Sequence, residues 1–299
     1  MPTEKKLFIA TSSFGKDKPE LLSVLKKKKI KFSLNKLKRK LKSKELVFYA
    51  KNYTHIIAGT ETYDKNTLTK LKNLKIIYRL GVGTDNIDLQ HTLKNKVRVF
   101  KSQVTLEKSV GELTLGLIFN LLRKISQHDH NLKSGIWKKE MGNLLFGKTI
   151  GIIGYGKIGK HLSKLLKNFG VKILFSDVKK IKNKISLKKL LTNSDIISIH
   201  TNYKKNNHHL LNKNYLKLLK TTSYIINTSR PELIDYDFLY ILLKNKKIKG
   251  AALDVFYNEP YNGKFCNLKN VILTPHIGSY ASEIRNEMET EAVNFIIKN

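Results

Sequence analysis

Apolar residues along this chain recur in short continuous runs, separated by stretches in which they return at helical spacing. Such runs are typical of strands buried on both faces of a parallel sheet, and the stretches between them are typical of covering helices. We interpret these runs as strands: Leu7–Ser12, Thr54–Thr60, Lys75–Gly81, Val97–Phe100, Thr149–Gly154, Val171–Asp177, Asp195–Thr201, Ser223–Ser229, Gly250–Val255 and Val271–Pro275. A long helix is expected near Thr105–Lys133 and a last one near Ala281–Ile297.

The runs fall into two series, and alternation of strand and helix within each predicts a parallel sheet with right-handed crossovers. Two such series in 299 residues predict two α/β domains, each with a doubly wound sheet. We place the first domain at residues 1–99 with 280–299 and the second at residues 100–279.

Composition narrows the class of protein. Hydrophobic residues make up 41% of the chain, enough to bury a full core. The single cysteine, Cys266, excludes an internal disulfide and favours a reducing compartment. The N-terminal apolar run is too short and too polar for a signal peptide, and no segment approaches the ~20 apolar residues of a membrane span. We therefore expect a cytoplasmic protein without membrane partners.

The charge is unusual, with 57 Lys and Arg against 23 Asp and Glu, a net +34. An excess of this size suits a binder of nucleic acid or anionic membrane. The excess is mainly lysine, however, and lies in every segment; even the densest run, Leu25–Lys44, alternates with apolar residues as solvated faces do. We attribute it to a composition bias and expect no specific nucleic-acid partner.

The stretch GIIGYGKIGK carries the spacing G-x-G-x-x-G at Gly154, Gly156 and Gly159. It follows an apolar strand, opens an amphipathic helix and precedes a strand that ends at Asp177, which is the context of a dinucleotide-binding turn. The helix N-terminus would receive the pyrophosphate, and Asp177 would accept from the ribose hydroxyls. NAD is therefore expected over NADP, although Lys179 and Lys180 weaken that preference.

Three further stretches, INTSRPELID, AALDVFYNEP and LTPHIGS, end later strands. They offer Arg230, Asp254, Glu259 and His276, a cation for a carboxylate substrate together with a proton carrier and acidic partners. Each residue alone also fits a surface, capping or loop role, and their joint occurrence favours a hydride-transfer site.

Together with RLGVGTDNID, these motifs resemble the D-isomer-specific 2-hydroxyacid dehydrogenases in order and spacing, from about Ile56 onward. The resemblance implies a Rossmann cofactor domain inserted in a flavodoxin-like substrate domain, with NAD as cofactor and no metal. It implies that Arg230 binds the substrate carboxylate, that His276 is the acid–base, and that Glu259 pairs with its ring and favours its protonated form. It also implies a homodimer through the helix near residues 105–133.

The resemblance further assigns binding roles to the residues around the turns. Cofactor contacts are implied at Gly154, Gly156, Lys157, Ile158, Gly159, Asp177, Thr201, Thr228, Ser229 and Asp254, the last holding the nicotinamide carboxamide. Backbone N–H groups of Val82 and Gly83 would help to seat the substrate carboxylate, beside Arg230 and His276. One departure is Pro231, where the family usually has Gly; proline pushes Arg230 toward extended geometry.

Details of the motifs look most like phosphoglycerate dehydrogenases, so 3-phospho-D-glycerate is the expected substrate, in serine biosynthesis. The alternatives are another D-2-hydroxy acid, of the glycerate, glyoxylate or lactate type, and an NAD-sensing binding protein like the family's transcriptional corepressors.

Overall fold

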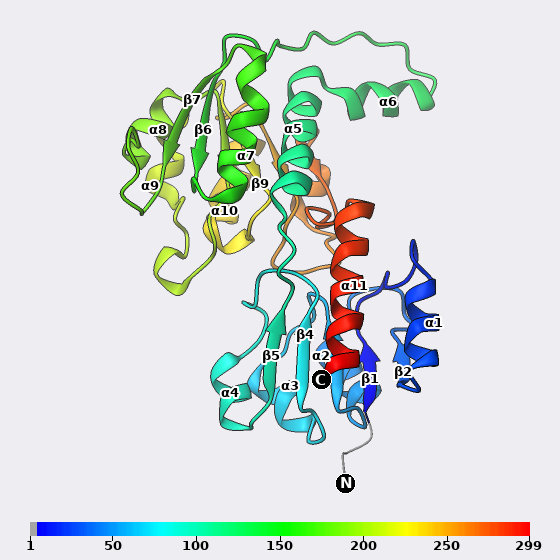
Figure 1. Ribbon diagram of the computed structural model, residues 1–299. Coiled ribbons are helices and arrows are strands. Elements are labelled where there is room, and N and C mark those ends of the chain that lie inside the picture. The colour runs from blue at the N-terminus through cyan, green and yellow to red at the C-terminus, as the bar shows by residue number, and fades with distance from the viewer. Residues whose placement is uncertain (1–4) are drawn as a thin grey trace. The chain divides into compact units, whose positions relative to one another are not determined.

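The computed structural model describes residues 5–299, which form two compact units. One comprises the chain up to Thr105 together with Ser279–Asn299, and the other comprises Leu106–Gly278 (Figure 1). The fold class expected from the sequence is confirmed, because each unit is an α/β structure around one parallel sheet.

The first unit has a five-stranded sheet of order β2-β1-β3-β4-β5 in which all pairs are parallel. Its strands are β1 (Lys6–Ile9), β2 (Lys31–Leu34), β3 (His55–Ala58), β4 (Ile76–Arg79) and β5 (Arg98–Lys101). Its helices are α1 (Glu20–Lys27), α2 (Ser43–Ala50), α3 (Lys65–Lys70), α4 (Leu89–Lys94) and α11 (Ser282–Lys298). Strands β3 and β4 are buried at every position, which explains why their central residues are apolar.

Strand β2 was not predicted, and it lies inside the basic stretch Leu25–Lys44. It is an edge strand with exposed or half-buried residues, so its apolar pattern is weak.

The second unit has a six-stranded parallel sheet of order β11-β10-β9-β8-β6-β7. Its strands are β6 (Thr149–Ile153), β7 (Lys172–Ser176), β8 (Ile196–Ile199), β9 (Tyr224–Asn227), β10 (Gly250–Leu253) and β11 (Val271–Leu273). Its α-helices are α5 (Glu107–Arg123), α6 (Ile125–Lys133), α7 (Lys157–Leu166), α8 (Leu187–Asn193), α9 (Lys213–Leu216) and α10 (Tyr236–Lys244). The 3₁₀ turns are η1 (Lys167–Phe169), η2 (Lys205–Asn207), η3 (Pro231–Leu233) and η4 (Lys264–Asn267).

Strand order in this sheet reverses at β6, which has β7 on one side and β8 on the other. Ligands of open α/β sheets bind at the carboxyl ends of the strands beside such a reversal. The sheet topology therefore directs attention to the turn after Ile153.

The long helix expected near Thr105–Lys133 is two helices. Lys124 has a φ of +55° and ends α5, after which α6 begins at Ile125. Helix α5 buries one face, including Leu117, Ile118 and Leu121, and packs against α7. Helix α6 buries no residue and extends away from the rest of its unit (Figure 1).

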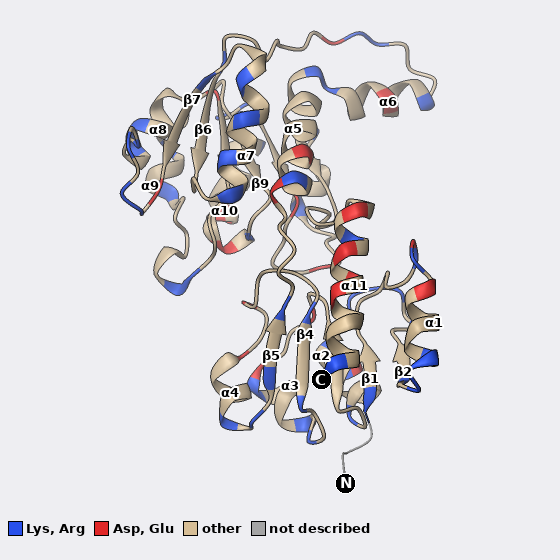
Figure 2. Cartoon of the chain, viewed as in Figure 1, with Lys and Arg blue, Asp and Glu red and all other residues tan. Residues whose placement is uncertain are grey.

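Lysine and arginine lie on helices and loops of both units rather than on one element (Figure 2). Within residues 5–299 no helix combines the length and apolar character that a bilayer crossing requires. The same residues contain no group of three or more His, Cys, Asp and Glu placed to hold a metal ion.

Candidate active site

The glycine turn lies between β6 and α7, where the strand order reverses. Gly154 has a φ of +91°, and a Cβ there would lie 2.5 Å from the His200 carbonyl oxygen. A Cβ on Gly159 would lie 2.2 Å from the Gly154 carbonyl oxygen, so the helix approaches the turn too closely for any side chain. Gly156 precedes the first residue of α7 and faces open space. The turn thus offers free room at a helix N-terminus, as a pyrophosphate requires.

Asp177 follows β7 and lies beside this turn. Its Oδ2 accepts a hydrogen bond from the Tyr155 backbone N–H at 2.7 Å, and its Oδ1 accepts from the Lys179 N–H at 2.8 Å. These bonds fix the carboxylate at the end of the strand next to β6, the position from which an acidic residue meets the ribose in this fold.

The other expected cofactor residues follow neighbouring strands. Lys157 and Ile158 begin α7, Thr201 follows β8, and Thr228 and Ser229 follow β9. Among residues 5–299 the buried Thr228 hydroxyl has no hydrogen-bond partner, which leaves it available to a ligand. The open turn, the fixed Asp177 and this hydroxyl together fit a dinucleotide.

His276 and Glu259 form a hydrogen-bonded pair, with 2.9 Å between Nδ1 and Oε1. The Glu259 carboxylate also accepts from the Phe256 backbone N–H at 3.2 Å. The His276 side chain is 28% exposed and that of Glu259 is 16% exposed, so the pair is half-buried yet open to a ligand. Because Nδ1 faces Glu259, Nε2 is the ring nitrogen that can exchange a proton with a substrate.

Asp254 follows β10 and is fully buried. Its Oδ1 accepts from the Thr274 hydroxyl at 2.6 Å and the Ile277 N–H at 2.8 Å, and its Oδ2 accepts from the Gly278 N–H at 3.0 Å. Burial raises the pKa of Asp254, and these donors oppose the rise. The carboxylate thus holds both sides of the loop that carries His276, a contact that sequence reasoning missed.

Arg230 stands at the end of β9, with φ −145° and ψ 142°, the extended geometry expected before Pro231. Pro231 is the first residue of η3, where its missing N–H costs nothing. The Arg230 Nη1 donates to the Ser229 carbonyl at 2.7 Å. The backbone at Arg230 and Pro231 is therefore compatible with proline.

Asn227 was also missed by sequence reasoning. Its side chain is fully buried; Nδ2 donates to the Arg230 carbonyl at 2.9 Å, and Oδ1 accepts from the Ser229 N–H at 3.0 Å. The sequence feature that could have revealed its role is its place in INTSR, where a polar residue ends an otherwise apolar strand. Asn227 therefore braces the turn that presents Arg230.

Val82 and Gly83 belong to the other unit, in the turn after β4. The Val82 side chain is exposed. Both residues lie at the carboxyl edge of their sheet, where ligands of such sheets bind.

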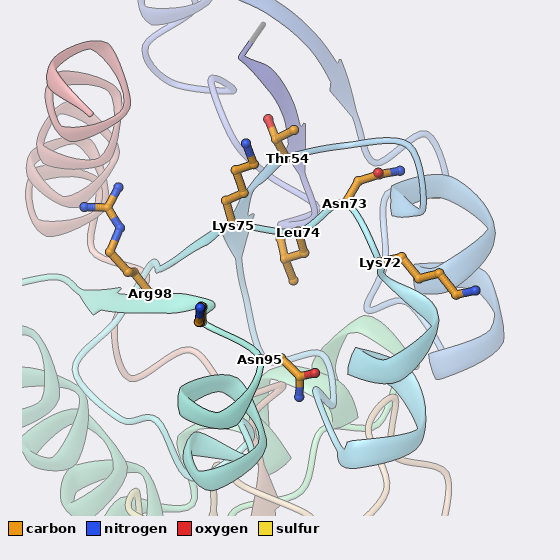
Figure 3. A pocket seen from close by; sticks show the side chains of 8 residues that line it. Thr54, Lys72, Asn73, Leu74, Lys75, Asn95 and Arg98 are labelled. Atoms are coloured by element: carbon orange, nitrogen blue, oxygen red, sulfur yellow. The ribbon is translucent and has the colours of Figure 1, made fainter. Parts of the chain in front are cut away.

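A hollow of about 610 Å³ in the first unit lies at the opposite, amino-terminal edge of its sheet. It is lined by Thr54, Lys72, Asn73, Leu74, Lys75, Asn95, Lys96 and Arg98. In Figure 3 the Lys72 and Asn95 side chains point away from Lys75 and Thr54, so the polar groups do not converge. We assign no function to this hollow.

In this dinucleotide fold an arginine follows β9 and a carboxylate-bound histidine follows β11, at the same edge of the sheet. This arrangement is the framework of a nicotinamide-dependent dehydrogenase. Comparison with known proteins identifies the family. The description "D-isomer specific 2-hydroxyacid dehydrogenase, NAD binding domain" matches residues 115–278, more than half of the chain. The chain belongs to the D-isomer-specific 2-hydroxyacid dehydrogenases, and its second unit is their NAD-binding domain.

The chain is also similar to individual members of this family. The chain is 38% identical to a glyoxylate reductase of Thermococcus litoralis over 79% of the chain and 77% of the relative. It is 36% identical to a hydroxypyruvate reductase of Thermotoga maritima over 76% of the chain and 78% of the relative. The solved D-lactate dehydrogenase of Aquifex aeolicus, in complex with NAD and lactic acid, matches with a TM-score of 0.83 and 27% identity, covering 98% and 94% of the two chains. The first two of these relatives are named for the reduction of glyoxylate and hydroxypyruvate, not for the oxidation of 3-phospho-D-glycerate.

Proposed function

We propose that the protein reduces a short 2-keto acid, of the glyoxylate or hydroxypyruvate type, to the corresponding D-2-hydroxy acid. The 2.9 Å pair of His276 and Glu259 carries this proposal, because it supplies a proton donor at the carboxyl edge of the sheet that also carries the NAD-binding turn. The names of the glyoxylate and hydroxypyruvate reductases support the substrate class.

The chain's own residues account for the remaining chemistry. When bound, NADH supplies the hydride. The turn at Gly154–Gly159 and Asp177 would hold the dinucleotide, and Arg230 would hold the substrate carboxylate and polarise the adjacent carbonyl. His276 would donate its Nε2 proton to the carbonyl oxygen while Nδ1–H stays on Glu259, so the developing alkoxide is neutralised as it forms. One keto acid, one hydride and one proton give one hydroxy acid.

The substrate assignment is tested by NADH oxidation with glyoxylate, hydroxypyruvate, pyruvate and 3-phosphohydroxypyruvate. We expect kcat/KM to be at least about tenfold higher for glyoxylate or hydroxypyruvate than for the phosphorylated acid, a difference of about 1.4 kcal/mol. His276→Asn should lower turnover by roughly 10²–10⁴-fold, the usual contribution of a positioned acid. His91→Asn, on α4 of the other unit, is the matched control and should leave turnover unchanged.

Two results would contradict the proposal. Fastest turnover of 3-phosphohydroxypyruvate would restore phosphoglycerate dehydrogenase as the function. Absence of turnover together with salt-dependent retention on DNA would favour the NAD-sensing binding protein.

We also propose that the protein is a homodimer and that α6 with the segment 134–147 forms the contact. This part of the chain exposes large apolar side chains: Ile125, Leu132, Ile136, Trp137, Met141, Leu144 and Phe146. An exposed apolar surface of this extent is typical of an interface. Helix α5, by contrast, is occupied by packing within its own unit.

Light scattering should give about twice the 34.4 kDa chain mass. Trp137→Glu should give the mass of one chain, because it places a charge among the exposed apolar side chains that would form the contact. A monomeric unmutated protein would contradict the dimer.

A further inference from the structure

Two charged side chains are buried at the carboxyl edge of the first sheet, beside the turn that contains Val82 and Gly83. Arg79 ends β4 and is 7% exposed; Glu61 follows the neighbouring strand β3 and is 2% exposed. Strands β3 and β4 are paired in parallel, with Ala58 opposite Arg79. Charged residues are almost never buried to this degree unless they are paired.

Glu61 is held by backbone groups. Its Oε2 accepts from the Gly59 N–H at 2.7 Å, and the Asn86 side chain donates to the Glu61 carbonyl at 2.6 Å and the Gly59 carbonyl at 3.2 Å. The nearby Arg79 charge favours the ionised carboxylate, opposing the effect of burial, which raises the pKa of Glu61. These hydrogen bonds fix the loop after β3, and the charge of Arg79 acts on the carboxylate that this loop carries.

Arg79 in turn contacts the start of the turn at residues 80–83. Its Nη1 donates to the Leu80 carbonyl. A Cβ on Gly81 would lie 2.6 Å from that Nη1, so the guanidinium lies directly against the Gly81 α-carbon. Gly81 has a φ of +147°, a conformation open to glycine and costly for other residues. The side chain therefore determines where a flexible piece of backbone can lie.

We propose that Arg79 and Glu61 are positioning residues, which hold the turn at 80–83 so that the N–H groups of Val82 and Gly83 can receive the substrate carboxylate. This inference rests on the proposed function, since it deepens the account of the same site. A glycine-rich turn without such support would lose its fixed geometry, and a displacement of about 1 Å in a positioning element can cost about a hundredfold. The pair acts through the backbone, because both side chains are buried.

The test separates affinity from turnover. Glu61→Gln keeps an oxygen that accepts from the Gly59 N–H but removes the negative charge near Arg79. Arg79→Lys keeps the positive charge but loses the planar set of guanidinium N–H donors. In both variants we expect the KM for the keto acid, and the Kd for oxalate in the presence of NADH, to rise about tenfold or more. We expect kcat to change by less than about threefold and the Kd of NADH to stay unchanged, because the cofactor domain is untouched.

The chain offers a matched control in the same unit. Glu289 is 1% exposed, accepts from the Gly15 N–H at 2.8 Å and pairs with Arg285 at 2.8 Å. Glu289→Gln therefore removes the same kind of buried charge away from the turn. It should lower the unfolding midpoint much as Glu61→Gln does, while the oxalate Kd stays constant.

The outcomes are distinguishable. An unchanged oxalate Kd in folded Glu61→Gln and Arg79→Lys, or an equal rise in Glu289→Gln, would overturn the positioning role. If the unmutated protein binds oxalate but turns over no keto acid, the proposed function fails, and the oxalate Kd values still decide the role of Arg79. If it binds no oxalate with NADH present, both fail.

Discussion

Replacement of Asp254 by asparagine should loosen the loop that carries His276. The amide can keep its oxygen toward the Thr274 hydroxyl and the Ile277 N–H, but its NH₂ group then faces the Gly278 N–H, which lies 3.0 Å from Oδ2 in the native protein. One hydrogen bond to a charged acceptor is lost, worth about 1.5–3 kcal/mol, and the two others weaken as their acceptor becomes neutral.

The charge itself is expensive to bury, as the raised pKa of Asp254 indicates, and the neutral amide recovers part of that cost. We therefore expect the free energy of unfolding to fall by about 2–3 kcal/mol. Activity should fall as well. His276 has a φ of +56°, a conformation that costs a non-glycine residue roughly 1–3 kcal/mol and persists only while its surroundings enforce it.

Urea unfolding followed by circular dichroism gives the stability, and NADH oxidation gives kcat/KM. Thr274→Val is the matched control, since it removes one of the three donors and leaves the carboxylate in place. It should cost less than Asp254→Asn in both assays. Stability within about 0.5 kcal/mol of the unmutated protein, together with unchanged kcat/KM in Asp254→Asn, would refute the view that this carboxylate holds the loop.

Four further changes test the remaining contacts. Asp177→Ala should narrow the preference for NAD over NADP by about 1–3 kcal/mol, measured as a ratio of Kd values; equal Kd values in the unmutated protein would contradict the assignment. Glu259→Gln should lower kcat for keto-acid reduction, because the neutral amide orients the His276 ring less firmly than the carboxylate that lies 2.9 Å from Nδ1; an unchanged kcat would mean that Glu259 does not orient the histidine. Pro231→Gly should leave the thermal midpoint within a few degrees but alter the KM for the keto acid, because glycine no longer holds Arg230 in extended geometry. If both the midpoint and the KM are unchanged, the proline is neutral. Burial lowers the pKa of His200 to about 4, so between pH ~6.5 and 4 the unfolded chain takes up a proton that the folded chain does not. As the pH falls from ~6.5 to 4, this group should therefore lower the free energy of unfolding by at most about 1.4 kcal/mol per pH unit. An equal slope in His200→Asn would show that His200 is not the cause.

The order of strands and helices could be predicted from the sequence, because the central strands are buried on both faces and are therefore mainly apolar. The position of the glycine turn could also be predicted from the sequence, because Gly154 has a positive φ and Gly159 has no room for a side chain. Edge strand β2 and the break at Lys124 were missed. An edge strand is only partly buried, so its apolar residues form a weak pattern in the sequence. A single residue with left-handed backbone geometry changes no hydrophobic pattern at all.

The contacts that give the site its geometry depend on the tertiary structure. Asp254 and Gly278 are 24 residues apart in sequence, and Glu61 follows β3 whereas Arg79 ends β4, so no spacing rule connects them. Parallel pairing brings the ends of β9, β10 and β11 to one edge, and the register decides which polar group meets which backbone donor. The sequence alone determined which chemical groups are present and at which strand ends; the packing of the sheet determined their partners, because hydrogen bonds of this kind depend on distances of a few tenths of an ångström.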